Sequence, residues 1–311
     1  MDIKTTIDNA NSLQEALQVL YRISPKERTA ILAEAMTGKT AEEYDSLGRI
    51  NRRQTYQRIV EDFKNRTDCY GINHLKRGMN IGTIIDVGCG SGLLSLELAE
   101  QTNGSILGID LSSEMLVFTE KNRKEREQER KEKRDHYLKI QEGSNIDATR
   151  NDDLFSFLKR VTFQQGSVYD LPQLLQNKSD TNYIVCRNAL HRFRDPTLAI
   201  EKMYESLSDK GKLYLRDLRR DAPWSIIRER IGKARWDSTT LVQDYIGAMA
   251  GMLRTPELEK IIQSLGIKDY TISDGSYQVS QNVTRINSES LQEYQREVEY
   301  VCVIKKSLPH H

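Results

Sequence analysis

The 311-residue sequence lacks an apolar run long enough to cross a membrane, and it lacks a large net charge of either sign. A membrane-spanning helix needs about 20 consecutive apolar residues. The 46 lysines and arginines face 45 aspartates and glutamates, which leaves a net charge of +1. A membrane protein is therefore excluded, and the charge balance argues against a nucleic-acid partner, which would select a basic surface.

Cysteines are few and far apart. Cys69, Cys89, Cys186 and Cys302 form no C-x-x-C pair, so we expect neither a disulfide framework nor a metal site. The N-terminal residues MDIKTTIDNANS lack the basic start and apolar stretch of a secretory signal. The sequence therefore predicts a cytoplasmic protein whose cysteines stay reduced.

Charged residues make up 29% of the chain, against ~25% in an average globular protein. The excess is concentrated in residues 120–135, of which 14 of 16 are charged. Opposite charges lie three or four positions apart there, as on a solvated helix. We expect an insertion over residues 120–158 that extends a helix beginning at Ser113, either as a lid over the substrate or as an arm that binds a partner.

Two kinds of periodicity divide the chain. Helical spacing of apolar residues over 12–64 predicts a helical N-terminal cap, residues 1–80. Beyond it, short apolar runs alternate with helical segments at 93–100, 196–207 and 255–265. Strands are expected at residues 83–87, 105–110, 161–163, 183–186, 212–215, 270–272 and 299–304. This alternation predicts an α/β fold with a seven-stranded, mostly parallel sheet.

The last two expected strands differ from the others because no helical segment separates them. Only the polar stretch 280–298 lies between residues 270–272 and 299–304. We therefore expect an antiparallel last strand that completes the sheet. The resulting domain covers residues 81–305, and residues 306–311 form a tail.

The most specific local signal is the glycine-rich segment DVGCGSG at Asp86–Gly92, between an expected strand and an expected helix. Gly88, Gly90 and Gly92 permit positive φ and bring no Cβ between the backbone and a ligand. Asp110 ends the next strand, where a carboxylate can accept hydrogen bonds from ribose hydroxyls. Together these features indicate a nucleoside-bearing ligand at the carboxyl ends of the strands.

The spacing of the glycines distinguishes between nucleoside ligands. It is G-x-G-x-G, whereas dinucleotide-binding proteins have G-x-G-x-x-G. The carboxylate of Asp86, just before the first glycine, would repel a pyrophosphate but suits an ammonium or sulfonium group. S-adenosylmethionine is therefore favoured over NAD, and a nucleotide-sugar or NAD enzyme of the same fold is the alternative.

From about Tyr44 to Lys305 the sequence resembles the class I S-adenosylmethionine-dependent methyltransferases, which have a Rossmann-like sheet, and among them the small-molecule and natural-product type. Five segments match in order. The first is DVGCGSG, which in that family forms the loop that wraps the methionine part of the cofactor. The resemblance implies a cofactor site formed by Tyr44, Arg49, Asp86, Gly88, Cys89, Gly90, Gly92, Asp110, Leu111, Met115, Ser167, Val168 and Asn188.

Individual roles within that site follow from the same resemblance. Leu111 and Met115 would lie beside the adenine, as would Ser167, which stands where family members usually have an acid, and the Val168 backbone. Asn188 belongs to the segment after the fourth strand, which faces the sulfonium and the substrate. Cys89 is interpreted as a small residue that packs within the loop, not as a reactive thiol.

Methyl transfer is an in-line displacement that needs a general base only when the acceptor carries a proton. His191 is the candidate base because it would lie near the methyl group, and histidine as a residue type can exchange a proton near neutral pH. The alternative is that His191 packs against the sheet and positions its neighbours.

Arginines gather after the fourth and fifth expected strands. They are Arg187, Arg192, Arg194, Arg216, Arg219 and Arg220. Guanidinium groups bind carboxylates bidentately, which suggests an acidic substrate contacted by Arg187, Arg192, Arg219 and Arg220, with Trp224 as a pocket wall. The alternative is a solvated rim in which these arginines pair with nearby aspartates, with Trp224 anchoring the following helix.

The sequence thus predicts methylation of a small molecule or modified peptide, at a carboxylate or hydroxyl oxygen, in natural product biosynthesis. A protein or RNA acceptor, or a non-catalytic module that keeps the cofactor pocket, is the alternative. Methylation of lysine or arginine is disfavoured because Asn188-Ala-Leu-His191 differs from the Asn/Asp-Pro-Pro-aromatic segment associated with amine methylation in this superfamily.

Overall fold

In the computed structural model the sheet is built around strands that are apolar on both faces. The structure describes residues 35–51, 53–69, 81–140, 156–175, 180–222, 244, 247–248, 251–276 and 298–307. Strand β1 (Thr83–Val87) is buried along its whole length, as expected for a strand covered on both sides. The strand order is β3-β2-β1-β4-β5-β7-β6.

The remaining strands follow the expected positions closely. They are β2 (Ser105–Asp110), β3 (Val161–Gln165), β4 (Thr181–Arg187), β5 (Lys212–Leu218), β6 (Tyr270–Asp274) and β7 (Glu299–Lys305). Strand β1 pairs in parallel with both β2 and β4, and β7 runs antiparallel to both β5 and β6. The predicted fold class, a seven-stranded and mostly parallel sheet with an antiparallel last strand, is confirmed.

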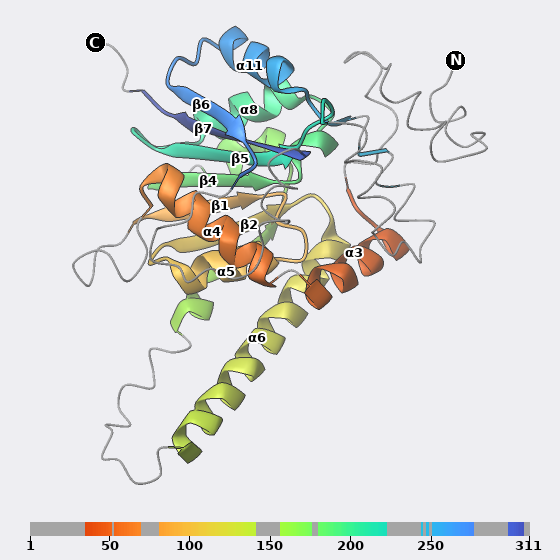
Figure 1. Ribbon diagram of the computed structural model, residues 1–311, viewed down its shortest axis with the longest axis vertical. Helices are drawn as coiled ribbons and strands as arrows, with labels where there is room; N and C mark the ends of the chain where they lie inside the picture. Colours follow the sequence, from red (N-terminus) through yellow and green to blue (C-terminus); the bar gives the residue numbers. More distant parts are fainter. Residues whose placement is uncertain are drawn as a thin grey trace.

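Helices cover both faces of this sheet (Figure 1). They are α3 (Gly38–Asn51), α4 (Arg53–Thr67), α5 (Leu93–Gln101), α6 (Ser113–Ile140), α7 (Leu171–Leu174), α8 (Pro196–Glu205) and α11 (Thr255–Ser264), with the 3₁₀ turns η3 (Ser156–Arg160), η4 (Val168–Asp170) and η5 (Leu190–Arg192). No helix in these described ranges is both long enough and apolar enough to cross a membrane. The helices expected before residue 35 lie outside the described residues.

The two faces of the sheet carry separate apolar cores. Ile85 points into the core that packs against α8 and α11, and its neighbour Ile84 points into the core that packs against α4 and α5. In the second core the ring of Phe63 meets the rings of Tyr183 and Tyr214 edge-on, each at a centroid distance of 5.7 Å. Helix α4, the second described helix of the predicted cap, is thereby part of this second core of the sheet.

The charged block forms the outer part of α6, which leaves the body of the molecule (Figure 1). Its inner side is not solvated as the sequence pattern suggested. Arg126 is buried and pairs with Glu97 at 3.1 Å and Glu100 at 2.6 Å, both on α5, and Arg130 also pairs with Glu100. Charge pairs therefore fix the inner part of α6 to α5. The predicted return of the insertion over residues 141–155 lies outside the described residues.

A buried charge cluster ties α4 to β5 and β7. The Arg216 side chain is fully buried and pairs with Asp62 at 3.2 Å and Glu299 at 2.6 Å. The Tyr214 hydroxyl also donates to Asp62, at 2.7 Å. The sequence placed Arg216 among the arginines of the substrate face, but it lies in β5 on the side that packs against α4, because it shares its face with Tyr214.

The cluster makes a stability prediction. Replacing Arg216 with methionine leaves the Glu299 carboxylate buried without its counter-charge and leaves Asp62 paired with Arg66 alone, at 2.8 Å, which should lower the free energy of unfolding by about 3–5 kcal/mol. The matched control is Arg219→Met, which removes a half-exposed arginine paired with Asp221 at 2.7 Å and should cost about 0–1 kcal/mol. Urea unfolding measures both, and equal effects would contradict the account.

Candidate functional site

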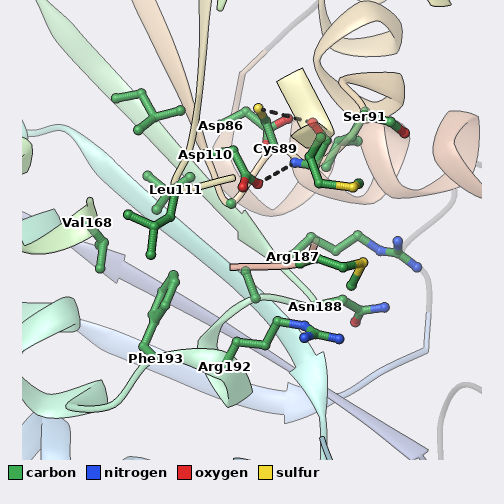
Figure 2. Close-up of a pocket in the computed structure, with 18 of the residues that line it drawn as sticks. Asp86, Cys89, Ser91, Asp110, Leu111, Val168, Arg187, Asn188, Arg192 and Phe193 are labelled. Carbon is green, nitrogen blue, oxygen red and sulfur yellow. Dashed lines mark hydrogen bonds between the residues drawn. The ribbon is translucent and has the colours of Figure 1, made fainter. Parts of the chain in front are cut away.

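A cleft opens at the carboxyl ends of β1, β2 and β4, where the strand order reverses (Figure 2). Ligands of open α/β sheets bind at this reversal point. The cleft has about 980 Å³ of empty space, part of it open to solvent. Its lining includes Met36, Tyr44, Tyr56, Asp86, Gly88, Cys89, Gly90, Ser91, Asp110, Leu111, Met115, Ser167, Val168, Tyr169, Arg187, Asn188, Arg192 and Phe193.

The glycine loop turns sharply between β1 and α5. Gly88 and Gly92 have φ of 71° and 77°, values that residues with a Cβ seldom adopt. A Cβ would also lie 2.5 Å from the Cβ of Ala189 at position 88, and 2.6 Å from the Phe163 ring at position 92. Gly92 is not among the lining residues. A glycine is needed there because the Phe163 ring packs against its backbone at the start of α5.

Asp86 lies at the base of the cleft and is only 1% exposed. Its carboxylate accepts a hydrogen bond of 2.6 Å from the Ser95 hydroxyl on α5. Burial raises the pKa of Asp86 to about 7, the Ser95 hydrogen bond opposes the rise, and nearby Asp110 adds to it. An acid in this state is poised to become the counter-charge of a bound cation.

The Asp110 carboxylate joins two turns. One oxygen accepts from the Gly90 N–H at 2.7 Å and the other from the Ser112 N–H at 2.9 Å. Burial raises the pKa of Asp110, and these backbone hydrogen bonds oppose the rise. Each carboxylate oxygen has more than one acceptor site, so both oxygens can accept a further hydrogen bond, as the two hydroxyls of a ribose would supply.

The two ends of the cleft differ in polarity. Figure 2 shows Leu111, Val168 and Phe193 at one end and the polar side chains of Arg187, Asn188 and Arg192 at the other. The apolar end suits a planar base. The Ser167 hydroxyl there accepts from the Tyr169 N–H at 3.2 Å, so it caps η4 and keeps its own proton to donate.

Asn188 is held in an unusual backbone conformation. Its φ is 50°, and its N–H donates to the Arg216 carbonyl at 2.9 Å. Its side-chain oxygen is buried and has no hydrogen-bond partner among the described residues. Such an acceptor in a cleft lining fits a ligand with an N–H group, and the ammonium of S-adenosylmethionine is one.

Side chains from the N-terminal cap close the same cleft. Met36 and Tyr44 reach it from the described part of the predicted cap that precedes α4, and Tyr56 reaches it from α4. The Arg187 guanidinium carbon lies 5.4 Å from the centre of the Tyr56 ring, a cation–π distance. Arg49 lies in α3, but its side chain is outside the described part of the structure.

His191 is buried behind the cleft and is not among its lining residues. The ring Nδ1 lies 2.6 Å from one oxygen of Asp217, and the backbone N–H donates to the other oxygen at 3.1 Å. A Cβ at Gly251 would come within 1.8 Å of the His191 carbonyl oxygen, so the backbone at Gly251 packs tightly against the turn that contains His191. The arrangement fixes the η5 turn.

The remaining candidate arginines divide between the cleft and other contacts. Arg192 lines the cleft and pairs with Asp244 at 2.5 Å. Arg219 pairs with Asp221, and buried Arg220 pairs with Glu257 at 2.8 Å. Neither Arg219 nor Arg220 is among the lining residues. Trp224 lies outside the described residues.

Several lining residues were not predicted as site residues from the sequence. Met36 and Tyr56 come from the cap, and Tyr169 and Phe193 come from turns that follow β3 and β4. The spacing of Tyr56 along its helix indicated a buried position and nothing more. Only the folded chain shows that this buried position borders the cleft.

Comparison with known proteins gives the family. A family model described as a methyltransferase domain matches residues 49–266. The chain belongs to this family, and the resemblance to class I S-adenosylmethionine-dependent methyltransferases seen in the sequence is confirmed. Its cofactor is therefore S-adenosylmethionine. A search of curated proteins found no match to the chain.

Solved structures share the fold at low sequence identity. The plantazolicin methyltransferase BamL, in complex with a triazolic desmethylPZN analogue and S-adenosylhomocysteine, is 13% identical with a TM-score of 0.58, over 96% of this chain and 100% of BamL. BpumL, another plantazolicin methyltransferase, is 18% identical with a TM-score of 0.53, over 94% and 98%. A candidate S-adenosylmethionine-dependent methyltransferase from Methanococcus maripaludis is 21% identical with a TM-score of 0.50, over 88% and 94%.

The raised pKa of Asp86 predicts opposite effects of Asp86→Asn on stability and binding. The unfolded carboxyl ionises near pH 4, whereas the folded one ionises at about 7, so the cofactor-free protein loses stability as the pH rises between these values. Thermal unfolding should therefore shift in favour of the variant over this range, while calorimetry at pH 8 shows weaker binding of S-adenosylmethionine. The control is Asp170→Asn at an exposed position, which should change neither stability nor binding. A difference in unfolding temperature between Asp86→Asn and the unmodified protein that does not vary with pH would contradict the assignment of a raised pKa to Asp86.

Asp110→Ala tests the ribose contact. Loss of two hydrogen bonds to a charged group, at about 1.5 kcal/mol each, should weaken binding of S-adenosylhomocysteine by about 100-fold. Asp170→Ala removes an exposed acid that is not among the lining residues and should leave the affinity unchanged. Isothermal titration calorimetry compares them, and unchanged affinity in Asp110→Ala would remove Asp110 from the cofactor site.

Proposed function

We propose that this methyltransferase transfers the methyl group to a carboxylate oxygen of an acidic small molecule or modified peptide. The observation that supports this choice is the set of ionisable side chains in the cleft. Among the described lining residues there is no histidine or lysine, and the only acids are Asp86 and Asp110, whereas Arg187 and Arg192 supply positive charge. An acidic acceptor that needs no general base fits this composition.

The chemistry of the acceptor explains why the lack of histidine and lysine among the described lining residues matters. S-adenosylmethionine supplies a methyl group activated by a positively charged sulfur. A hydroxyl acceptor must lose a proton during transfer, and a general base contributes about 10²–10⁴-fold to such a step. A carboxylate is already ionised at neutral pH. The enzyme then has to align the two reactants and exclude water.

The two acids of the cleft fit the cofactor, not the acceptor. Asp110 joins the glycine loop to the turn after β2 and has acceptor capacity left for ribose hydroxyls. Asp86 is buried below the loop, where it can balance a cationic ligand. The buried side-chain oxygen of Asn188 can accept from the ammonium. Leu111 and Val168 border the apolar end that suits the adenine.

The two arginines are assigned by their neighbours. Arg187 stacks on Tyr56 and lies close enough to Asp86 to lower its pKa, which places its charge near the methionine end and suits the cofactor carboxylate. Arg192 lies in the turn that His191 and Asp217 fix, Asp244 orients its guanidinium, and its charge also lowers the pKa of Asp110. We therefore assign the acceptor carboxylate to Arg192.

The solved structures allow a peptide acceptor. BamL binds a desmethylPZN analogue, and it shares the fold over nearly the whole of this chain. Identity of 13% carries the fold and not the substrate. A modified peptide is nevertheless a suitable acceptor, because an acidic peptide terminus presents the same carboxylate group that Arg192 would bind.

The chemical stability of the product tests the proposal. Methyl-tritiated S-adenosylmethionine is incubated with the enzyme and a panel of small carboxylic acids and peptides, each beside its methyl amide, in which the carboxylate is blocked. We expect label only in the free acids, released as volatile methanol by mild alkali because esters hydrolyse. Label that survives alkali would show methylation of a hydroxyl, nitrogen or carbon and would contradict the proposal.

Two variants assign the roles. Arg192→Ala should raise the KM for the acceptor at least tenfold and change the affinity for S-adenosylhomocysteine much less, whereas exposed Arg194→Ala should alter neither.

His191→Gln should retain turnover within about tenfold at saturating substrates, since loss of a general base costs about 10²–10⁴-fold. A larger loss together with alkali-stable label would identify His191 as the base of a hydroxyl methylation.

A further inference from the structure

One buried side chain joins the cap to the glycine loop. Asn122, on α6, is 2% exposed, and its amide nitrogen makes two hydrogen bonds. It donates to the Asp45 carboxylate on α3 at 3.0 Å and to the Ser91 carbonyl in the glycine loop at 2.9 Å. Both hydrogens of the side-chain amide are thereby used. No chemistry of methyl transfer requires a residue at this place.

The contacts on either side of Asn122 lead directly to the cleft. Ser91 is itself a lining residue, and so is Tyr44, the neighbour of Asp45 on α3. Asp45 is buried as well, so this hydrogen bond is shielded from water, where it is stronger than an exposed one. One amide group therefore links α3 directly to the glycine loop.

Two further hydrogen bonds hold residues 36–38 to the N-terminal end of α6. The Ser112 hydroxyl donates to the Met36 carbonyl, and the Gly38 N–H donates to Glu114 at 2.5 Å. Ser112 also donates its N–H to Asp110. Figure 1 shows α3 lying against the first part of α6, before the charged arm leaves the body.

We propose that Asn122 is a positioning residue of the methyltransferase, which sets the cap helix α3 against the glycine loop so that Tyr44 and Met36 close over the bound cofactor. Asn122 touches neither reactant. It acts through Asp45 and Ser91, and the first three turns of α6 serve as the template on which α3 and the glycine loop are aligned. The inference concerns cofactor retention, so it holds whichever atom accepts the methyl group.

The position of Asn122 gives it a different role from Arg126, another buried polar residue of α6. Arg126, one turn further along, is also buried, but it pairs with Glu97 and Glu100 of α5 and touches neither α3 nor the glycine loop in the described contacts. Its loss should destabilise the fold and leave the cleft walls aligned. The two residues therefore separate a positioning effect from a general loss of stability.

The test measures retention of S-adenosylhomocysteine, which needs no acceptor. Asn122→Ala should raise its dissociation rate and equilibrium dissociation constant about tenfold, as expected for one lost hydrogen bond to a charged group, and raise the KM for S-adenosylmethionine more than it lowers kcat. Arg126→Met should lower the unfolding temperature and leave the dissociation rate unchanged. Stopped-flow displacement and calorimetry, both below the unfolding temperatures, give these values.

Asp45 supplies the second side of the test. Asp45→Ala removes the same hydrogen bond from the cap and should reproduce the tenfold effect, even if Asn122→Ala fails to fold. Asp45→Asn keeps an oxygen that can accept from Asn122 and should restore retention. The double variant should be no weaker than either single one. Unchanged dissociation in Asp45→Ala, or additive effects in the double variant, would overturn the proposal.

Discussion

The hydrogen bonds that Asp110 accepts from the backbone of Gly90 and Ser112 are the contacts on which the cleft depends. They join the loop after β1 to the turn after β2, and the parallel pairing of these strands brings the two together. Ser112 in turn contacts the start of the cap, and Ser91 contacts Asn122. The glycine loop, Asp110 and residues 36–45 are therefore parts of one hydrogen-bonded unit.

The sequence predicted the sheet well because its signals are local. The β-branched run at β1, the positive-φ glycines and the acid at the end of β2 each depend on neighbouring residues, and all lie where expected. Long-range pairings could not be predicted in the same way. Nothing in the sequence indicates that Arg216 pairs with Asp62 and Glu299, or that Arg126 is buried against α5, because those partners lie far apart along the chain.

The candidate site shows the same division. The lining residues taken from the glycine loop and the strand ends were predictable because motif spacing places them at one edge of the sheet. Met36, Tyr56 and Phe193 were missed because helices and turns bring them in from elsewhere. His191 follows β4 as expected, yet its ring is bound to Asp217 behind the cleft, and this orientation depends on a residue 26 positions away. Because Asp217 holds the His191 ring and His191 does not line the cleft, we propose an acceptor that needs no general base.

A crystal structure of the protein with S-adenosylhomocysteine tests the central claim, that this unit forms the cofactor site, most directly. The account predicts that the ribose hydroxyls contact Asp110, that the amino group contacts the side-chain oxygen of Asn188, and that Tyr44 covers the bound molecule while Asn122 keeps both of its contacts. A cofactor bound without contact to Asp110, or a cap displaced from the glycine loop in the complex, would contradict it.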